Sequence, residues 1–162
     1  MTVLFVILLA CLLAKSIGTP LDDYVWAPDD HYKWEYMGDE NIIEGRSLNG
    51  EHTWKGYMVN MTSQQWLTPE DVTQSIWWHV LVVIVPDTVD WSKNATMWVT
   101  GSSNTSPLPD NKSEDVQLAA NLAMGTGVIT GCLFQIPNEK VVFSSDPLQK
   151  SRGEDAIIAF TW

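Results

Sequence analysis

The sequence has few cysteines, little positive charge and only one long apolar run. It contains 2 cysteines, and 9 Lys and Arg residues stand against 20 Asp and Glu residues, for a formal net charge of −11. An acidic chain of this kind repels phosphate backbones, so nucleic acid is not an expected partner. Residues 3–13 are apolar throughout. No later stretch reaches the roughly 18 apolar residues that a membrane span needs.

The sequence also lacks the spacings that mark metal, cofactor and nucleophile sites. The three histidines, His31, His52 and His79, are far apart, and neither an H-E-x-x-H nor a C-x-x-C motif occurs. Gly125-Thr126-Gly127 follows a predicted helix, whereas a phosphate-binding loop precedes one. No G-x-S-x-G turn is present. We therefore expect no metal, no cofactor and no catalytic residue in this chain, and we interpret His79, which lies in an apolar segment, as structural.

The amino-terminal run predicts secretion. Residues 3–13 have the length of a signal-peptide core, and the small residues Ser16 and Gly18 stand at the expected cleavage positions before Thr19. A signal peptide over residues 1–18 would leave no stable membrane span after its removal. An uncleaved membrane anchor is the alternative.

Four N-x-S/T sequons follow the predicted signal and agree with a secretory route. They begin at Asn60, Asn94, Asn104 and Asn111. Asn94 and Asn111 are the favoured acceptors, because three of the sequons fall in what reads as an exposed loop region and Asn60 falls in a β-like segment. The sequence thus predicts a secreted, extracellular glycoprotein.

Only Cys132 remains once Cys11 is assigned to the signal. Cys132 lies in an apolar segment, which favours a buried thiol, and a partner beyond the C-terminus is the alternative. The 9 tryptophans leave a similar choice. Packing in the core is the favoured interpretation, because most of them lie in β-like or helical segments, and sugar binding by exposed rings is the alternative.

Residues 19–162 carry the pattern of a mixed α/β domain. A helix start at 19–23 precedes β-like segments at 32–37 and 52–61, with hairpin turn chemistry at Gly45 and Asn49-Gly50. Residues 76–85 predict a strand buried on both faces, and a short strand is predicted at 97–100.

The carboxyl-terminal half predicts two helices around one strand. Ser113 and Gly125 bracket a helix whose inner face carries Val116, Ala119, Ala120 and Ala123, and a strand follows at 128–136. Ser151 to Glu154 match a capping box that opens a last helix. Alternating strands and helices are typical of a parallel sheet, and no strand follows the last helix. We therefore expect a fold that is incomplete at the C-terminus.

Gly101 and Ser102 form the one candidate site. They follow a predicted buried strand and precede a helix, and in α/β-hydrolases the loop at this place gives a backbone N–H to the oxyanion hole. The alternative is a glycine that simply ends a strand in a glycosylated loop. A glycan on Asn104 would crowd this site.

Several segments resemble the PhoPQ-activated pathogenicity-related protein family in the same order along the chain. They are TPLDDYVWAPDDHYKW, MVNMTSQQWLTPEDV, IWWHVLVVIVPD, MWVTGSSN, QIPNEKVVFSSDP and EDAIIAFTW, and the resemblance extends from Thr19 to Trp162. The resemblance implies an α/β-hydrolase-like fold of several hundred residues, with the nucleophile downstream of the segment EDAIIAFTW. In the family the loop has two glycines, whereas Ser102 takes the second place here. No catalytic Ser, Asp or His can be carried over.

Two classes of function follow. As an enzyme, a full-length form would be a serine-hydrolase-like or peptidase-like protein, with Gly101 and Ser102 as backbone donors. As a non-catalytic protein, the chain would be an extracellular signal or proliferation-regulating protein with a cell-surface or peptide partner. A natural short isoform and an incomplete gene model would both give the pattern seen here.

Overall fold

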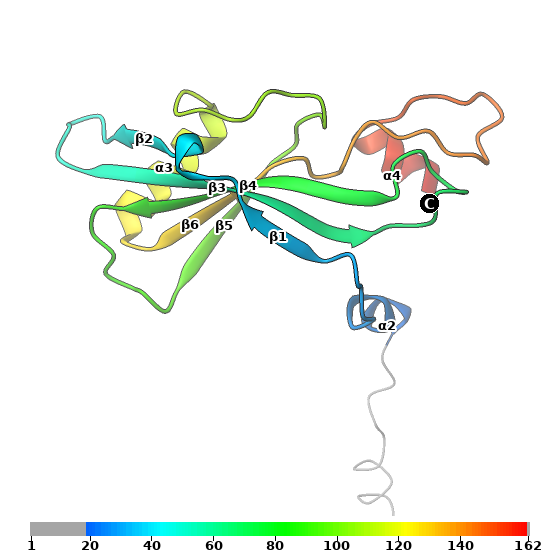
Figure 1. The fold of residues 1–162 in the computed structure, drawn as a ribbon, viewed down its shortest axis with the longest axis horizontal. Helices are drawn as coiled ribbons and strands as arrows, with labels where there is room; N and C mark the ends of the chain where they lie inside the picture. The colour runs from blue at the N-terminus through cyan, green and yellow to red at the C-terminus, as the bar shows by residue number, and fades with distance from the viewer. Residues whose placement is uncertain (1–18, 162) are drawn as a thin grey trace, which may run out of the picture.

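The computed structural model describes residues 19–161, so the predicted signal peptide at 1–18 lies outside the described residues. Its centre is a six-stranded sheet of order β1-β3-β4-β6-β5, with β2 also pairing to β3 (Figure 1). The elements are α2 (Pro20–Val25), β1 (Lys33–Tyr36), η1 (Asp39–Asn41), β2 (Ile43–Arg46), β3 (Thr53–Gln65), β4 (Ile76–Pro86), β5 (Ala95–Val99), α3 (Glu114–Thr126), β6 (Ile129–Leu133) and α4 (Asp155–Thr161).

The sheet is mixed. Strands β1, β2 and β4 pair antiparallel with β3, and β6 pairs antiparallel with β4. Strands β5 and β6 form a parallel pair joined by α3. The predicted α/β class with a mixed sheet and flanking helices is therefore confirmed. The parallel pairing inferred from the strand–helix rhythm holds for β5 and β6, because a parallel connection needs a crossover element such as α3.

The two β-like segments predicted at 32–37 and 52–61 pair antiparallel, as β1 and β3, but the sequence did not predict the strand β2 that lies between them along the chain. The Asn49-Gly50 turn joins β2 to β3, with Arg46 opposite Thr53, whereas β1 pairs with the far half of β3, with Lys33 opposite Thr62. Gly45 lies within β2 rather than in a turn. A Cβ at this position would lie 2.5 Å from the Trp54 ring, so the glycine lets the indole pack against the strand.

Helix α2 begins where the sequence predicts it. The Thr19 hydroxyl accepts a hydrogen bond from the Asp22 amide at 3.3 Å, and the Asp22 carboxylate accepts one from the Thr19 amide at 2.6 Å. This reciprocal pair is a capping box. No residue of α2 is buried, so its local capping rather than packing explains the helix.

Helix α3 covers one face of the sheet. Its predicted inner residues, Val116, Ala119, Ala120 and Ala123, have no exposed surface. The small alanine side chains let the helix lie close to β4 and β6. The predicted C-terminal end at Gly125 was two residues early, because Gly127 is the residue in the left-handed conformation, with φ 66°.

Burial on the sheet alternates, which corrects the expectation that β4 is buried on both faces. On the covered face, defined by the side of the sheet that meets α3, Val82 and Ile84 have no exposed surface. On the other side, here called the open face, Leu81 and Val83 are half-buried. The apolar run in β4 thus indicated strand correctly, but not its two-sided burial.

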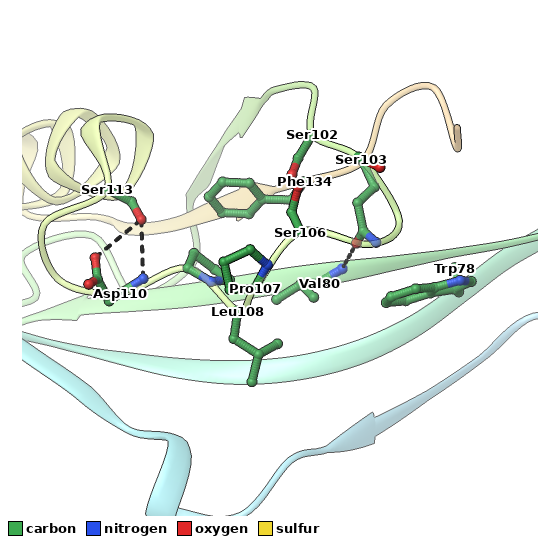
Figure 2. Close-up of a pocket in the computed structure, with 12 residues that line it drawn as sticks. Trp78, Val80, Ser102, Ser103, Ser106, Pro107, Leu108, Asp110, Ser113 and Phe134 are labelled. Atoms are coloured by element: carbon green, nitrogen blue, oxygen red, sulfur yellow. Dashed lines mark hydrogen bonds between the residues drawn. The ribbon is translucent and has the colours of Figure 1, made fainter. Parts of the chain in front are cut away.

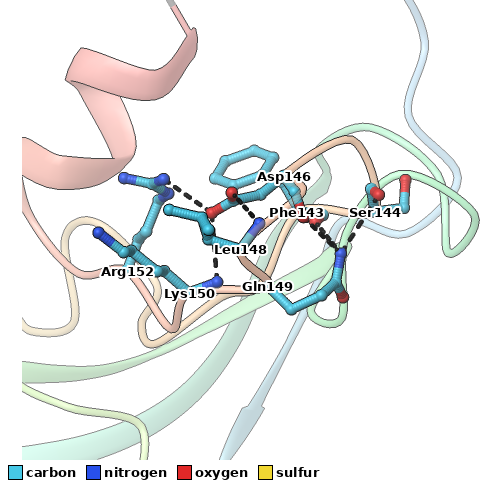
Figure 3. A network of polar contacts seen from close by, with 7 residues as sticks. All are labelled: Phe143, Ser144, Asp146, Leu148, Gln149, Lys150 and Arg152. Carbon is cyan, nitrogen blue, oxygen red and sulfur yellow. Dashed lines mark hydrogen bonds and ion pairs between the residues drawn. The ribbon is translucent and has the colours of Figure 1, made fainter.

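Residues 139–161 form a smaller unit beside the sheet. Ile157 of α4 packs with Val72, Val141 and Phe143 in a second apolar cluster. The loop before α4 wraps around the Asp146 carboxylate, which accepts hydrogen bonds from the Leu148 and Lys150 amides and from the Arg152 guanidinium (Figure 3). These bonds hold the pKa of Asp146 below its usual range, with the Leu148 amide as the largest cause.

The predicted capping box at Ser151 does not form. Arg152 instead pairs with Val141 through both backbone groups, at 2.8 and 2.9 Å, and α4 begins only at Asp155. The Arg152 guanidinium also lies 4.3 Å from the centre of the Phe160 ring. Within residues 19–161, no helix combines the length and apolar character needed to cross a membrane.

Candidate functional site

A pocket of about 290 Å³ lies where the loop between β5 and α3 passes over the ends of β4 and β6 (Figure 2). Its floor is apolar and its rim is polar. The floor is made by Trp78 and Val80 of β4 and by Phe134, and the loop adds Ser102, Ser103, Ser106, Pro107, Leu108, Pro109, Asp110 and Ser113. Gln135 completes the lining.

The predicted site residues lie at the start of this loop. The Gly101 carbonyl accepts a hydrogen bond from the Gln135 amide at 3.1 Å, and the Thr100 carbonyl accepts one from the Ile136 amide at 3.1 Å. The chain after β5 is thereby fastened to the chain after β6. Ser102 then turns away with φ 127°, a backbone region that side chains rarely adopt.

This turn leaves backbone donors at the pocket. Within residues 19–161, the N–H groups of Gly101, Ser102 and Ser103 have no hydrogen-bond partner, and Ser102 and Ser103 line the cavity. Consecutive free N–H groups are the donors that stabilise an oxyanion. Of the predicted residues, Ser102 lines the pocket and Gly101 does not, and Ser103, which the sequence did not single out, lines it as well.

One nearby charge opposes an anion at this place. The Glu154 carboxylate lies 3.6 Å from the position that a Cβ on Gly101 would take. The backbone of Glu154 is held in place because its amide donates a hydrogen bond to the Glu139 carboxylate at 2.8 Å. Because Glu154 is exposed, solvent screens most of its effect.

Asn104 holds the loop down through a contact that the sequence did not predict. Its amide nitrogen donates to Asn138 Oδ1 at 3.0 Å, and its Oδ1 accepts from the Glu139 amide at 3.3 Å. Asn138 has no exposed surface and donates in turn to the Trp78 carbonyl. The two asparagines are 34 residues apart, so no local pattern could have paired them.

His79 supports the pocket from beneath, as the structural interpretation predicted. It is 1% exposed, its Nδ1 lies 3.1 Å from the Phe134 carbonyl and 3.2 Å from the Gln135 carbonyl, and its Nε2 lies 2.8 Å from the Ser63 hydroxyl. A neutral ring satisfies all three contacts, with Nδ1 donating and Nε2 accepting. Burial accordingly lowers the pKa of His79, although the two carbonyls oppose this shift.

In the described part of the chain, the pocket lining combines donors with one carboxylate and contains no histidine. Asp110 is the one charged residue among those that line it, and its carboxylate accepts from the Lys112 amide at 2.8 Å and from the Ser113 hydroxyl. Ser103 contacts Thr105 rather than a histidine. Among the described residues, the lining thus holds free backbone N–H groups and hydroxyls, but it brings no serine together with a histidine.

The predicted sequons lie in different surroundings. Asn60, Asn94 and Asn111 are exposed, whereas Asn104 is half-buried. The Asn111 amide donates to the Glu44 carbonyl at 2.9 Å, and Asn94 ends a turn closed by its own amide on the Trp91 carbonyl at 3.0 Å.

The surroundings of Cys132 and of the tryptophans bear on two of the alternatives that the sequence leaves open. Cys132 is a free, fully buried thiol, as expected, and burial raises its pKa to about 12. The prediction that the tryptophans pack in the core holds for only some of them. Trp54 is buried at 1%, but four others are exposed, namely Trp26, Trp34, Trp91 and Trp98.

Comparison with known proteins places the chain in a family. The profile of the PhoPQ-activated pathogenicity-related protein family matches residues 21–162. The autocrine proliferation repressor protein A of Dictyostelium discoideum is 34% identical over the whole of this chain, which spans 30% of that relative's length. No solved structure matches. The match over residues 21–162 includes the β5–α3 loop and every element of the sheet, and this chain therefore belongs to the PhoPQ-activated pathogenicity-related protein family.

Proposed function

We propose that the chain is the N-terminal part of a secreted, N-glycosylated, α/β-hydrolase-like protein and that it supplies the oxyanion half of a serine-hydrolase-type site. The observation that carries this proposal is the row of free N–H groups at Gly101, Ser102 and Ser103 on the loop between β5 and α3. In α/β-hydrolases, the loop between a strand and the following helix supplies such a donor.

The attacking serine would come from further sequence, so the chain alone would not be catalytic. Two observations support this division. The relative is more than three times as long as the matched part, since this chain spans 30% of it. The pocket has hydroxyl and amide donors but no histidine in its lining.

A non-catalytic signalling role is the second candidate. It is favoured by the relative, which is named a repressor of autocrine proliferation. In this case the chain would act outside the cell through a cell-surface or peptide partner, and the apolar open face of the sheet would be a surface for contact. Met97 and Val99 on that face are 55% and 53% exposed.

An anion titration tests the oxyanion assignment without requiring catalysis. Phenylphosphonate, a tetrahedral anion, is added to isotope-labelled protein while amide resonances are followed. We expect the largest shifts at residues 101–103, and tighter binding by Glu154→Gln, because that change removes the nearest negative charge. Shifts that spare residues 101–103 would contradict the assignment.

The backbone strain at Ser102 offers a matched variant. Ser102→Gly keeps the N–H donor and removes the side chain that disfavours φ 127°. We expect it to raise the free energy of unfolding by about 1 kcal/mol while retaining phenylphosphonate binding. Equilibrium denaturation measures the first effect, and the same titration measures the second. A loss of stability would show that the serine hydroxyl, and not the backbone, determines the loop conformation.

A further inference from the structure

The Asn104 sequon differs from the other three because Asn104 is half-buried and its acceptor nitrogen donates to a fully buried side chain, whereas the nitrogen of the exposed Asn111 donates to the carbonyl of the exposed Glu44. Asn104 Nδ2 donates to Asn138 Oδ1 at 3.0 Å, and Asn138 has no exposed surface. Two further polar groups of Asn104 also have partners. Its Oδ1 accepts from the Glu139 amide at 3.3 Å, and its backbone amide donates to the Glu139 carbonyl at 3.0 Å.

Glycan transfer would change the atom that makes this contact. The C1–O bond of a lipid-linked oligosaccharide diphosphate breaks, a C1–Nδ2 bond forms, and one amide proton leaves with the diphosphate. The sugar ring replaces one of the two hydrogens of Nδ2, the nitrogen that lies 3.0 Å from Oδ1 of the buried Asn138. Because protein interiors are close-packed, the ring fits only if the loop lifts away from residues 138–139.

Asn94 presents the opposite case. It is exposed, it ends a turn just before β5, and within residues 19–161 its side chain makes no hydrogen bond. A sugar on its Nδ2 would project into solvent without breaking any contact of the fold. The sequon hydroxyl of Thr96 lies 2.7 Å from that of Thr130, a bond that can form after the transfer has taken place.

We propose that Asn94 carries a glycan, and that Asn104 stays unmodified and serves as the clasp that holds the pocket loop over β4 and β6. The proposal rests on the secretory route proposed above. It also explains how a sequon three residues after Gly101 can coexist with an accessible pocket, because the Asn104 side chain turns inward instead of carrying a glycan at the pocket rim.

Site-specific mapping tests both halves. The chain is secreted from a eukaryotic host in two forms, one with its own residues 1–18 and one with a host signal peptide. Glycans are then released enzymatically in heavy-oxygen water, which marks each occupied asparagine. In the folded, secreted protein we expect full marking of Asn94 and none of Asn104. A marked Asn104, or an unmarked Asn94, in the form with the host signal would overturn the proposal.

The two forms separate this proposal from that of secretion. If only the form with the host signal is secreted, residues 1–18 do not act as a signal peptide and the proposal of secretion is wrong. The glycans mapped on Asn94 and Asn104 in the host-signal form then still test the glycosylation proposal.

Two variants distinguish the clasp from the sequon. Ser106→Ala removes the sequon and leaves the Asn104 amide intact, so we expect no change in glycan mass or melting temperature. Asn104→Asp removes the sequon as well, but it sets a carboxylate oxygen against Asn138 Oδ1. We expect that variant to melt several degrees lower and its amides at 102–106 to exchange faster with solvent. Equal melting temperatures and equal exchange rates in the two variants would contradict the proposal that the Asn104–Asn138 contact holds the loop.

Discussion

Both faces of the sheet carry apolar side chains, but helix α3 packs on only one of them. On the covered face, Val82 and Ile84 are fully buried beneath α3. On the open face, Val83 is half-buried, and Met97 and Val99 at the β5 edge are more than half exposed. Apolar surface of this extent is typical of an interface rather than of a solvated face. The open face is the contact surface of the signalling role proposed above.

The largest expected difference between the faces is in stability. Val82→Ala and Val83→Ala make the same chemical change at adjacent positions of β4. Val82→Ala leaves a cavity in a packed core, so we expect it to lower the free energy of unfolding by roughly 1.5–3 kcal/mol. Val83→Ala should cost less than about 1 kcal/mol, since its side chain keeps solvent contact in the folded state. Urea denaturation compares the two, and equal losses would show that something covers the open face.

We expect His79 to make the stability of the fold depend on pH. Its side chain belongs to the open face but, unlike Leu81 and Val83, it is buried. Its folded pKa lies below the unfolded value of about 6.5, so the folded ring stays neutral while the unfolded ring takes up a proton. Stability is therefore complete above pH ~6.5 and falls as the pH drops below it, by up to about 1.4 kcal/mol per pH unit until the folded pKa is reached.

The control for this effect is His79→Gln, which can still donate to a carbonyl and accept from Ser63. We expect the difference in unfolding free energy between the parent and this variant to shift in favour of the variant between pH 7.5 and pH 5.5. A constant difference across this range would show that folding does not lower the pKa of His79.

The smallest expected change in folding stability comes from the open edge. Met97→Lys combined with Val99→Lys should change the unfolding free energy by less than about 0.5 kcal/mol per site, because both side chains are largely exposed. The charges should nevertheless reduce self-association at the unpaired β5 edge. Leu118→Lys, on the exposed side of α3, is the matched control. Sedimentation velocity measures self-association in both variants. An equal reduction by Leu118→Lys and by the double substitution would contradict this interpretation.

Features with a local cause could be predicted from the sequence. The α3 face follows from the spacing of Val116, Ala119 and Ala123, and the α2 cap follows from Thr19 and Asp22. Strand β4 was evident from its β-branched run, but its burial was not, because burial on each face depends on which elements lie there. The position of the pocket loop followed from Gly101 at the end of a predicted strand.

Features with a distant cause could not be predicted. The partner of β1 is the far half of β3, and only the tertiary fold determines that register. The positive φ of Ser102 and the clasp between Asn104 and Asn138 arise because two loops meet after β5 and β6. The Asp146 loop has the same origin, since Arg152 serves a buried carboxylate instead of the first turn of α4.

The central claim is that this chain supplies anion-stabilising N–H groups without an attacking serine. The most direct test treats the purified protein with a fluorophosphonate probe and, in parallel, with a chromogenic ester. We expect no stoichiometric serine adduct and no ester turnover above that of denatured protein. An adduct on a single serine, such as Ser63 beside His79, together with turnover that its alanine variant loses, would contradict the account.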